Sequence, residues 1–83
     1  MPRDEIDVPI DEIYVPVDRR KTLNPETVES LSASILEEGL KNALYVRHDG
    51  KRYILVEGLH RLEACRALGE TTVRALLVQA RRK

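Results

Sequence analysis

One stretch decides the fold of this 83-residue chain: Val56-Glu57-Gly58-Leu59-His60-Arg61-Leu62-Glu63-Ala64-Cys65-Arg66-Ala67-Leu68-Gly69. It continues an apolar run, Tyr53-Ile54-Leu55-Val56, after which the spacing of the apolar residues changes. Over residues 62–68 they recur at helical spacing, so the pattern predicts a strand that passes directly into a helix. Gly58 marks the change, because glycine permits a sharp turn or a close backbone approach that a side chain would block.

His60 and Arg61 fall in the first turn of the predicted helix, where backbone N–H groups lack partners within the helix. Free N–H donors, the helix dipole and two side chains that can carry positive charge together favour an anion. The stretch therefore predicts an anion site, with phosphate as its simplest ligand. From spacing alone, the simpler interpretation is a solvent-exposed His60 and an ion pair between Arg61 and Glu57 or Glu63.

Length and composition predict a single domain over residues 1–83 with a small core. Trp and Phe are absent, so the core must consist of Leu, Ile, Val and Ala with three Tyr. Fourteen basic and fourteen acidic residues cancel, so charge gives no argument for binding DNA or a membrane. We expect the polar ends, residues 1–5 and 79–83, to be flexible.

Cys65 is the one cysteine, which excludes an intrachain disulfide and a site with several cysteine ligands for a metal. It lies on the apolar side of the predicted helix and is interpreted as a small core residue, not a nucleophile. No apolar stretch is long enough for a signal peptide or a transmembrane helix. The chain is therefore expected to be soluble and cytoplasmic, without a membrane partner.

The remaining pattern predicts a small α+β domain in which helices pack on a mixed β-sheet. Pro9 cannot donate a hydrogen bond to a neighbouring strand, so its strand is expected at an edge. Asp49-Gly50 is typical of a tight hairpin turn, whose two central residues favour positive φ. The predicted elements are a strand over 6–10, a turn over 11–13 that buries Ile13, a loop over 14–23, a helix over 25–38, strands over 44–48 and 51–56, a helix over 60–68 and a strand over 73–78.

Asn24-Pro25 is a strong start signal for the first helix, with Asn as N-cap and Pro at the first helical position. Gly39 is expected to end this helix. Three hydroxyl residues, Thr27, Ser30 and Ser34, follow one flank, a pattern that ordinary surface residues also produce. The apolar face of the helix is predicted to consist of Val28, Leu31, Ile35 and Leu36.

These motifs resemble those of the ParB/sulfiredoxin superfamily, over a range from about Ile6 to Val78. In sulfiredoxins the turn corresponding to residues 58–61 reads Gly-Cys-His-Arg, and the cysteine attacks a phosphorylated sulfinic acid of a peroxiredoxin. In ParB proteins the turn reads Gly-Glu-Arg-Arg and grips the phosphates of CTP. Leu59 stands at the position of the sulfiredoxin cysteine, so we expect no sulfiredoxin activity. The matching segments are residues 8–13, 24–26, 34–35, 39–40, 58–61, 63–64 and 68–69.

The resemblance implies that Gly58, His60 and Arg61 bind the phosphates of ATP or CTP, together with Mg²⁺. It also implies that Ser30 and Ser34 line the nucleotide site, because they match hydroxyl residues of the sulfiredoxin ATP site. Thr27 departs from sulfiredoxins, which have Lys at this position.

Charged residues that precede the turn in the chain could add to this site. Glu57 could hold a metal-bound phosphate or a neighbouring Arg. Within residues 19–21 one basic side chain could reach the nucleotide, or the run could be only a solvated connection. No residue is identified as a catalytic base.

Three hypotheses about function follow from the resemblance. The first is a nucleotide-binding regulatory module, ParB-like in fold but without the DNA-binding and dimerisation domains of a full partition protein. Such a module would be linked to DNA partition or other DNA-associated processes, with DNA or a DNA-binding protein as partner. The second is an enzyme of the same fold, namely a small-molecule kinase, an NTPase or a ParB-like nuclease. The third is a protein interaction module that binds no nucleotide. The nucleotide base and the oligomeric state stay open.

Overall fold

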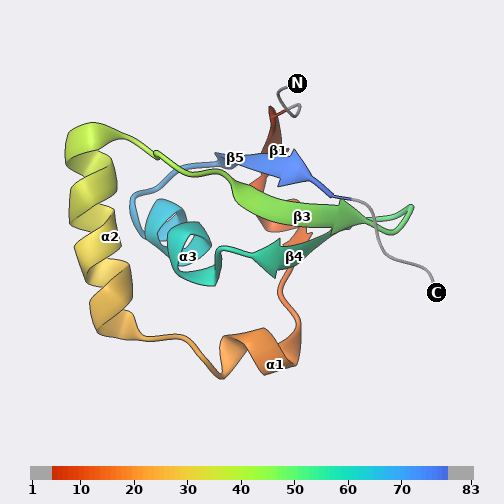
Figure 1. Cartoon of the computed structure of the whole chain (residues 1–83), viewed down its shortest axis with the longest axis horizontal. Helices are drawn as coiled ribbons and strands as arrows, with labels where there is room; N and C mark the ends of the chain where they lie inside the picture. The colour runs from red at the N-terminus through yellow and green to blue at the C-terminus, as the bar shows by residue number, and fades with distance from the viewer. Residues whose placement is uncertain (1–4, 79–83) are drawn as a thin grey trace.

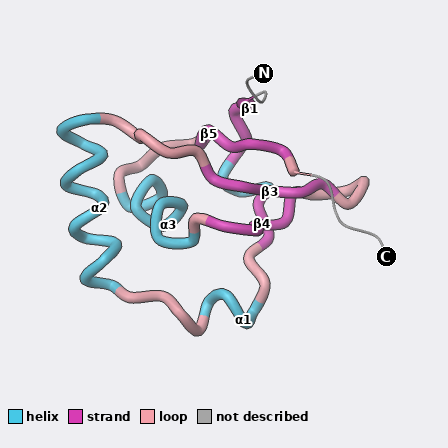
Figure 2. Tube along the Cα trace, viewed as in Figure 1, coloured by secondary structure: helices cyan, strands magenta, loops and turns pink. Residues whose placement is uncertain are grey.

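The computed structural model of the chain describes residues 5–78, which form one sheet and three α-helices (Figure 1, Figure 2). The ends predicted to be flexible lie outside this range, except Glu5, which begins the first strand. The elements are β1 (Glu5–Pro9), the 3₁₀ turn η1 (Ile10–Glu12), β2 (Ile13–Tyr14), α1 (Val17–Arg20), α2 (Pro25–Glu38), β3 (Leu44–His48), β4 (Tyr53–Glu57), α3 (Leu59–Ala67) and β5 (Thr72–Leu77).

The five strands form a mixed sheet in the order β1-β5-β3-β4-β2, which confirms the predicted α+β class. β1 pairs with β5 and β3 with β4 in antiparallel fashion, whereas β3 and β5, and β2 and β4, are parallel. β1 lies at an edge as predicted, with Pro9 at its end beside Thr72. Figure 1 shows α3 between the sheet and α2, so the helices form two successive layers on the sheet.

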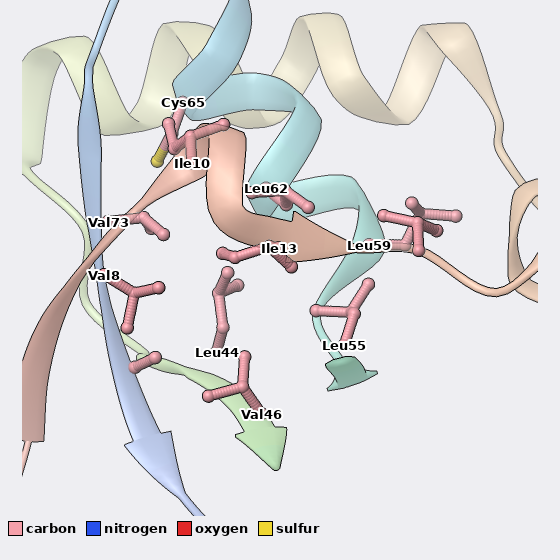
Figure 3. Close-up of a cluster of buried hydrophobic side chains, with 12 residues drawn as sticks. Val8, Ile10, Ile13, Leu44, Val46, Leu55, Leu59, Leu62, Cys65 and Val73 are labelled. Atoms are coloured by element: carbon pink, nitrogen blue, oxygen red, sulfur yellow. The ribbon is translucent and has the colours of Figure 1, made fainter. Parts of the chain in front are cut away.

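The core lies between the sheet and α3 (Figure 3). Leu44 and Val46 of β3 are fully buried, and Tyr45 between them is exposed, as expected for a strand with one face covered. Leu62 of α3 is fully buried against this face, and Ile13 is buried as predicted. Fully burying one Leu or Val side chain stabilises the fold by about 1.5–3 kcal/mol. The position of α3 is therefore fixed chiefly by apolar contacts with the sheet.

Helix α2 packs more loosely, because none of its residues is buried. Asn24 is its N-cap as predicted, and its Oδ1 accepts hydrogen bonds from the N–H groups of Glu26 (2.9 Å) and Thr27 (3.3 Å). Gly39, with φ of 83°, follows the last helical residue. Leu36 was expected on the apolar face, but its side chain is 77% exposed. That prediction is wrong, because α3 is the main neighbour of α2 and covers only a narrow stripe of its surface.

Two further details of the predicted elements need correction. Residues 14–23 were predicted to be a loop, but Tyr14 belongs to the two-residue β2, and α1 forms one helical turn. Elements this short show no periodicity, so the pattern could not indicate them. The turn at Asp49 is also longer than predicted, because only Gly50 has positive φ. The Oδ1 of Asp49 accepts hydrogen bonds from the N–H groups of Lys51 and Arg52, which stabilises a four-residue loop instead.

None of the helices within residues 5–78 has the length and apolar character needed to cross a membrane.

The difference between the two helix layers predicts different costs for two leucine substitutions. Leu62→Ala should lower the free energy of unfolding by about 2–5 kcal/mol, because it leaves a cavity in the core. Leu36→Ala should change it by less than about 0.5 kcal/mol, because the side chain is already in solvent. Urea denaturation of both variants measures this, and equal losses would mean that α2 is covered on its outer side.

Candidate functional site

Gly58 joins β4 to α3 and has φ of 111° and ψ of 29°, a left-handed conformation that glycine adopts most readily. A Cβ atom at this position would lie 2.5 Å from Cδ2 of Leu44 and 3.4 Å from its Cα. The turn therefore requires glycine for two independent reasons, its backbone angles and its contact with β3. This confirms the sharp turn predicted from the sequence, and the close approach that the missing side chain permits is to Leu44 of β3.

The residues after Gly58 form the open end of α3. Leu59, His60 and Arg61 occupy the first helical turn, as predicted, and no side chain caps it. His60 and Arg61 are both half-buried. An open cavity of about 260 Å³ adjoins this end, lined by Thr27, Leu31, Glu57, Gly58, Leu59, His60 and Arg61. A helix N-terminus with an Arg and a His beside a small cavity suits an anion.

His60 has a hydrogen-bond partner that its local sequence does not indicate. Its Nε2 accepts a hydrogen bond from the backbone N–H of Asn24, at 3.0 Å. A ring nitrogen accepts a hydrogen bond only when it carries no proton, so this bond requires the neutral imidazole with its proton on Nδ1. The bond joins the start of α3 to the N-cap of α2, two points 36 residues apart in the chain. His60 is thus neither purely exposed nor free of a protein partner.

Glu57 pairs with Arg19 of α1, with 3.6 Å between Oε1 and Nη1. Both side chains are well exposed, so the pair contributes little to stability. Arg19 is thereby the member of the basic run at 19–21 that contacts a residue of the cavity lining. Arg20 turns away and donates from Nε to the carbonyl oxygen of Val15, at 3.1 Å.

Ser30 and Ser34 are exposed on α2 and do not line the cavity. The α2 residues that do line it are Thr27 and Leu31. The structure therefore brings together Glu57, Gly58, His60 and Arg61, and leaves the two serines farther along the same helix. Within residues 5–78, no group of three or more His, Cys, Asp and Glu side chains could hold a metal ion.

A larger cavity, of about 560 Å³, lies near the other end of α2 but suits an anion poorly. Its one basic side chain, Arg74, already contacts Oε1 of Glu5 (3.4 Å) and the carbonyl oxygen of Leu40 (3.2 Å). The carboxylates of Asp7 and Glu70 line the same cavity and would repel a phosphate. The smaller cavity at Gly58 is the better candidate.

Cys65 lies in the core with 3% of its surface exposed, as predicted. Burial raises the pKa of its thiol, and the charge of Glu70 raises it further. A protonated, inaccessible thiol is a poor nucleophile. Leu59, at the turn itself, is also part of the core, with 7% exposed.

Comparison with known proteins places this turn in a family context. The profile of the ParB N-terminal domain matches residues 2–83. The chain belongs to this family. A probable chromosome-partitioning protein ParB of Helicobacter pylori is 32% identical to it over 74 residues, 88% of the chain. The chain spans only 26% of the length of that relative.

Solved structures with the same fold include both branches of the superfamily. This chain aligns with sulfiredoxin from Arabidopsis thaliana at a TM-score of 0.83 and 27% sequence identity. The alignment covers 93% of this chain and 86% of the sulfiredoxin chain. It aligns with C-terminally truncated ParB from Caulobacter crescentus, complexed with CTP-gamma-S, at a TM-score of 0.81 and 28% identity. That alignment covers 94% of this chain and 46% of the Caulobacter chain. The ParB/sulfiredoxin fold predicted from the sequence is thus confirmed.

Replacing Gly58 should be more costly than replacing another glycine that also has positive φ. Gly58→Ala combines backbone strain of about 1–3 kcal/mol with the contact to Leu44, so the loss of stability should exceed that strain. Gly69→Ala is the matched control, because φ is 84° there and nothing lies within 4 Å of the added Cβ. Thermal and urea unfolding of both variants measure the difference. Equal losses would contradict the tight approach of this turn to β3.

The state of the Cys65 thiol predicts slow chemical labelling. In the folded protein a thiol reagent at neutral pH should react far more slowly than after unfolding in urea. Because the folded state holds the thiol proton more tightly, stability should be complete below the ordinary thiol pKa and fall as the pH rises above it. Cys65→Ala should remove this fall at high pH. Rapid labelling of the native protein would show that the thiol is accessible.

Proposed function

We propose that this ParB-type domain binds the phosphates of a nucleoside triphosphate, ATP or CTP with Mg²⁺, at the turn formed by residues 58–61. The observation that carries the proposal is the uncapped N-terminus of α3, held against β3 by Gly58 and opening on a cavity that His60 and Arg61 line. A phosphate oxygen there would accept hydrogen bonds from backbone N–H groups that have no partner within the helix.

The charges around the turn support an anionic ligand. The guanidinium of Arg61 offers two parallel N–H donors, which suit a phosphate group. Arg19 lies near enough to Glu57 to hold that carboxylate away from the phosphate or to contact the phosphate itself. Thr27 of α2 also lines the cavity, and its hydroxyl would add a neutral donor. Mg²⁺ would arrive with the nucleotide and neutralise part of its charge.

The rest of the nucleotide would extend along α2. Thr27, Ser30 and Ser34 lie on one flank of this helix, and Thr27 already lines the cavity. We therefore assign Ser30 and Ser34 to the part of the ligand beyond the phosphates, at the ribose or the base. This assignment separates their role from that of Arg61, because their loss should alter the preference between ATP and CTP more than the affinity for inorganic phosphate.

The biological role we propose is regulatory, in DNA partition or another DNA-associated process. Its support is the family and the Caulobacter crescentus ParB, which was crystallised with CTP-gamma-S. DNA or a DNA-binding protein is the proposed partner. Sulfiredoxin chemistry is not part of the proposal, because Leu59 occupies the position of the cysteine and packs in the core.

Two arginines of α3 provide the test of this proposal. Arg61→Ala should weaken nucleotide binding about 10- to 100-fold, the loss of a charged hydrogen bond worth about 1.5–3 kcal/mol. Arg66→Ala is the matched control, because Arg66 pairs with Glu63 one turn later and does not line this cavity. Two-dimensional NMR titrations with ATP, CTP and inorganic phosphate, each with Mg²⁺, measure the affinities and rank the bases.

The outcomes separate the three hypotheses about function. Saturable shifts of the signals of residues 58–63, weakened by Arg61→Ala, would support the nucleotide site. If the bound nucleotide is neither hydrolysed nor used for phosphoryl transfer, the domain is a binding module. Turnover that survives repurification and depends on Arg61 would instead favour an enzyme of the same fold. Spectra that do not change with any of the three ligands would overturn the proposal and leave a protein interaction module.

A further inference from the structure

The segment between β2 and α2 is attached to the rest of the domain in an unusual way. We call residues 16–24 the strap; it contains α1 and passes beneath α3 and β4 in the view of Figure 1. None of its residues is buried, so apolar packing holds it only weakly. Two of its polar contacts go to residues close to Gly58: the side chain of Arg19 pairs with Glu57, and the backbone N–H of Asn24 donates to Nε2 of His60.

We propose that the strap stays bound to the Gly58 turn only while His60 is neutral. A proton on His60 or an anion at the turn would break this attachment. Attachment of the strap would then depend on whether the proposed anion site is empty or occupied. The anion part of this inference rests on the proposed function, whereas the proton part rests on the hydrogen bond between Asn24 and His60 alone.

The effect of a proton follows from the geometry of that bond. Nε2 of His60 accepts from the Asn24 N–H at 3.0 Å, so it must be unprotonated. Protonation turns Nε2 into a donor, and two N–H groups would then face each other. Histidine is the side chain whose charge can change between about pH 5 and 8, so acidification over this range tests the exchange of roles.

An anion should act in the same direction. A phosphate at the turn favours the charged form of a nearby imidazole, which cannot accept from Asn24. It also competes with Glu57 for Arg19, whose present pair is long and exposed. Both contacts that join the strap to the Gly58 turn therefore weaken when the site fills, whereas the bond from Arg20 to Val15 is not affected. By linkage, a fastened strap must lower the affinity for the anion by the same factor.

Charged groups of both signs lie on the elements around His60. Arg61 on its own helix and Arg19 on the strap are cationic, whereas Glu57 at the end of β4 and Glu26 in the first turn of α2 are anionic. A proton or an anion that arrives at the turn therefore meets groups of both signs.

The experiment follows the amides of residues 17–24 by NMR in the whole chain, with two variants as references. His60→Ala defines the released strap. His60→Gln supplies an acceptor oxygen that does not titrate, and so defines a strap that stays fastened in acid. The His60 ring nitrogens are observed in parallel, and at about pH 8 the wild type should carry its proton on Nδ1.

On acidification from about pH 8 to about pH 5, the wild-type strap signals should move to the His60→Ala positions, whereas those of His60→Gln should stay. The protection factor of the Asn24 amide should fall about five- to tenfold, the loss of one hydrogen bond. Pyrophosphate added at neutral pH should cause the same shifts in the wild type. Identical titration in His60→Gln, or a proton on Nε2 at high pH, would overturn the inference.

The anion arm can fail separately from the proposed function. If pyrophosphate saturates the signals of residues 58–63 while Asn24 keeps its protection, the site exists and the coupling does not. If pyrophosphate and nucleotides change nothing at residues 58–63, the proposed function is wrong, and the acid titration alone then decides whether His60 fastens the strap.

Discussion

The contact between Gly58 and Leu44 constrains most of this structure. Leu44 begins β3, the middle strand of the sheet, and its side chain fills the space that a Cβ at residue 58 would need. The absence of that Cβ lets the backbone turn from β4 into α3 without leaving the core. Leu59 and Leu62 can then reach the sheet from the first turn of α3. The same turn leaves the N–H groups of α3 without a side-chain cap, so the geometry that closes the core also forms the proposed anion site.

The second helix layer shows how polar contacts can position an element that apolar packing holds weakly. α2 has no buried residue, and its neighbour among the helices is α3. Its N-terminus is nevertheless located, because Asn24 caps the helix with its side chain and bonds His60 with its backbone N–H. One residue thus sets both the start of α2 and its placement over the proposed nucleotide site. Local stability there should depend on hydrogen bonds more than on burial.

The parts of the fold that local patterns encode could be predicted, and the parts that depend on distant partners could not. The strand, glycine and helix around Gly58, the Asn24 cap and the edge position of Pro9 all follow from short-range rules, and the structure confirms them. The exposure of Leu36 could not be predicted, because it depends on how much of α2 its neighbours cover. The bond to His60 and the pairing of Arg19 join residues more than thirty positions apart, and no local signal marks them.

The two edge strands of the sheet affect how readily molecules of this protein would pair with one another at high concentration. One edge is β2, which has only two residues, and the other is β1, which ends at Pro9. A short strand offers few free backbone groups to a second molecule, and a proline offers no N–H donor. β1 also carries the carboxylates of Glu5 and Asp7. Although the sheet is not closed into a barrel, within residues 5–78 both of its edge strands are poor templates for intermolecular strand pairing, which should disfavour fibril formation.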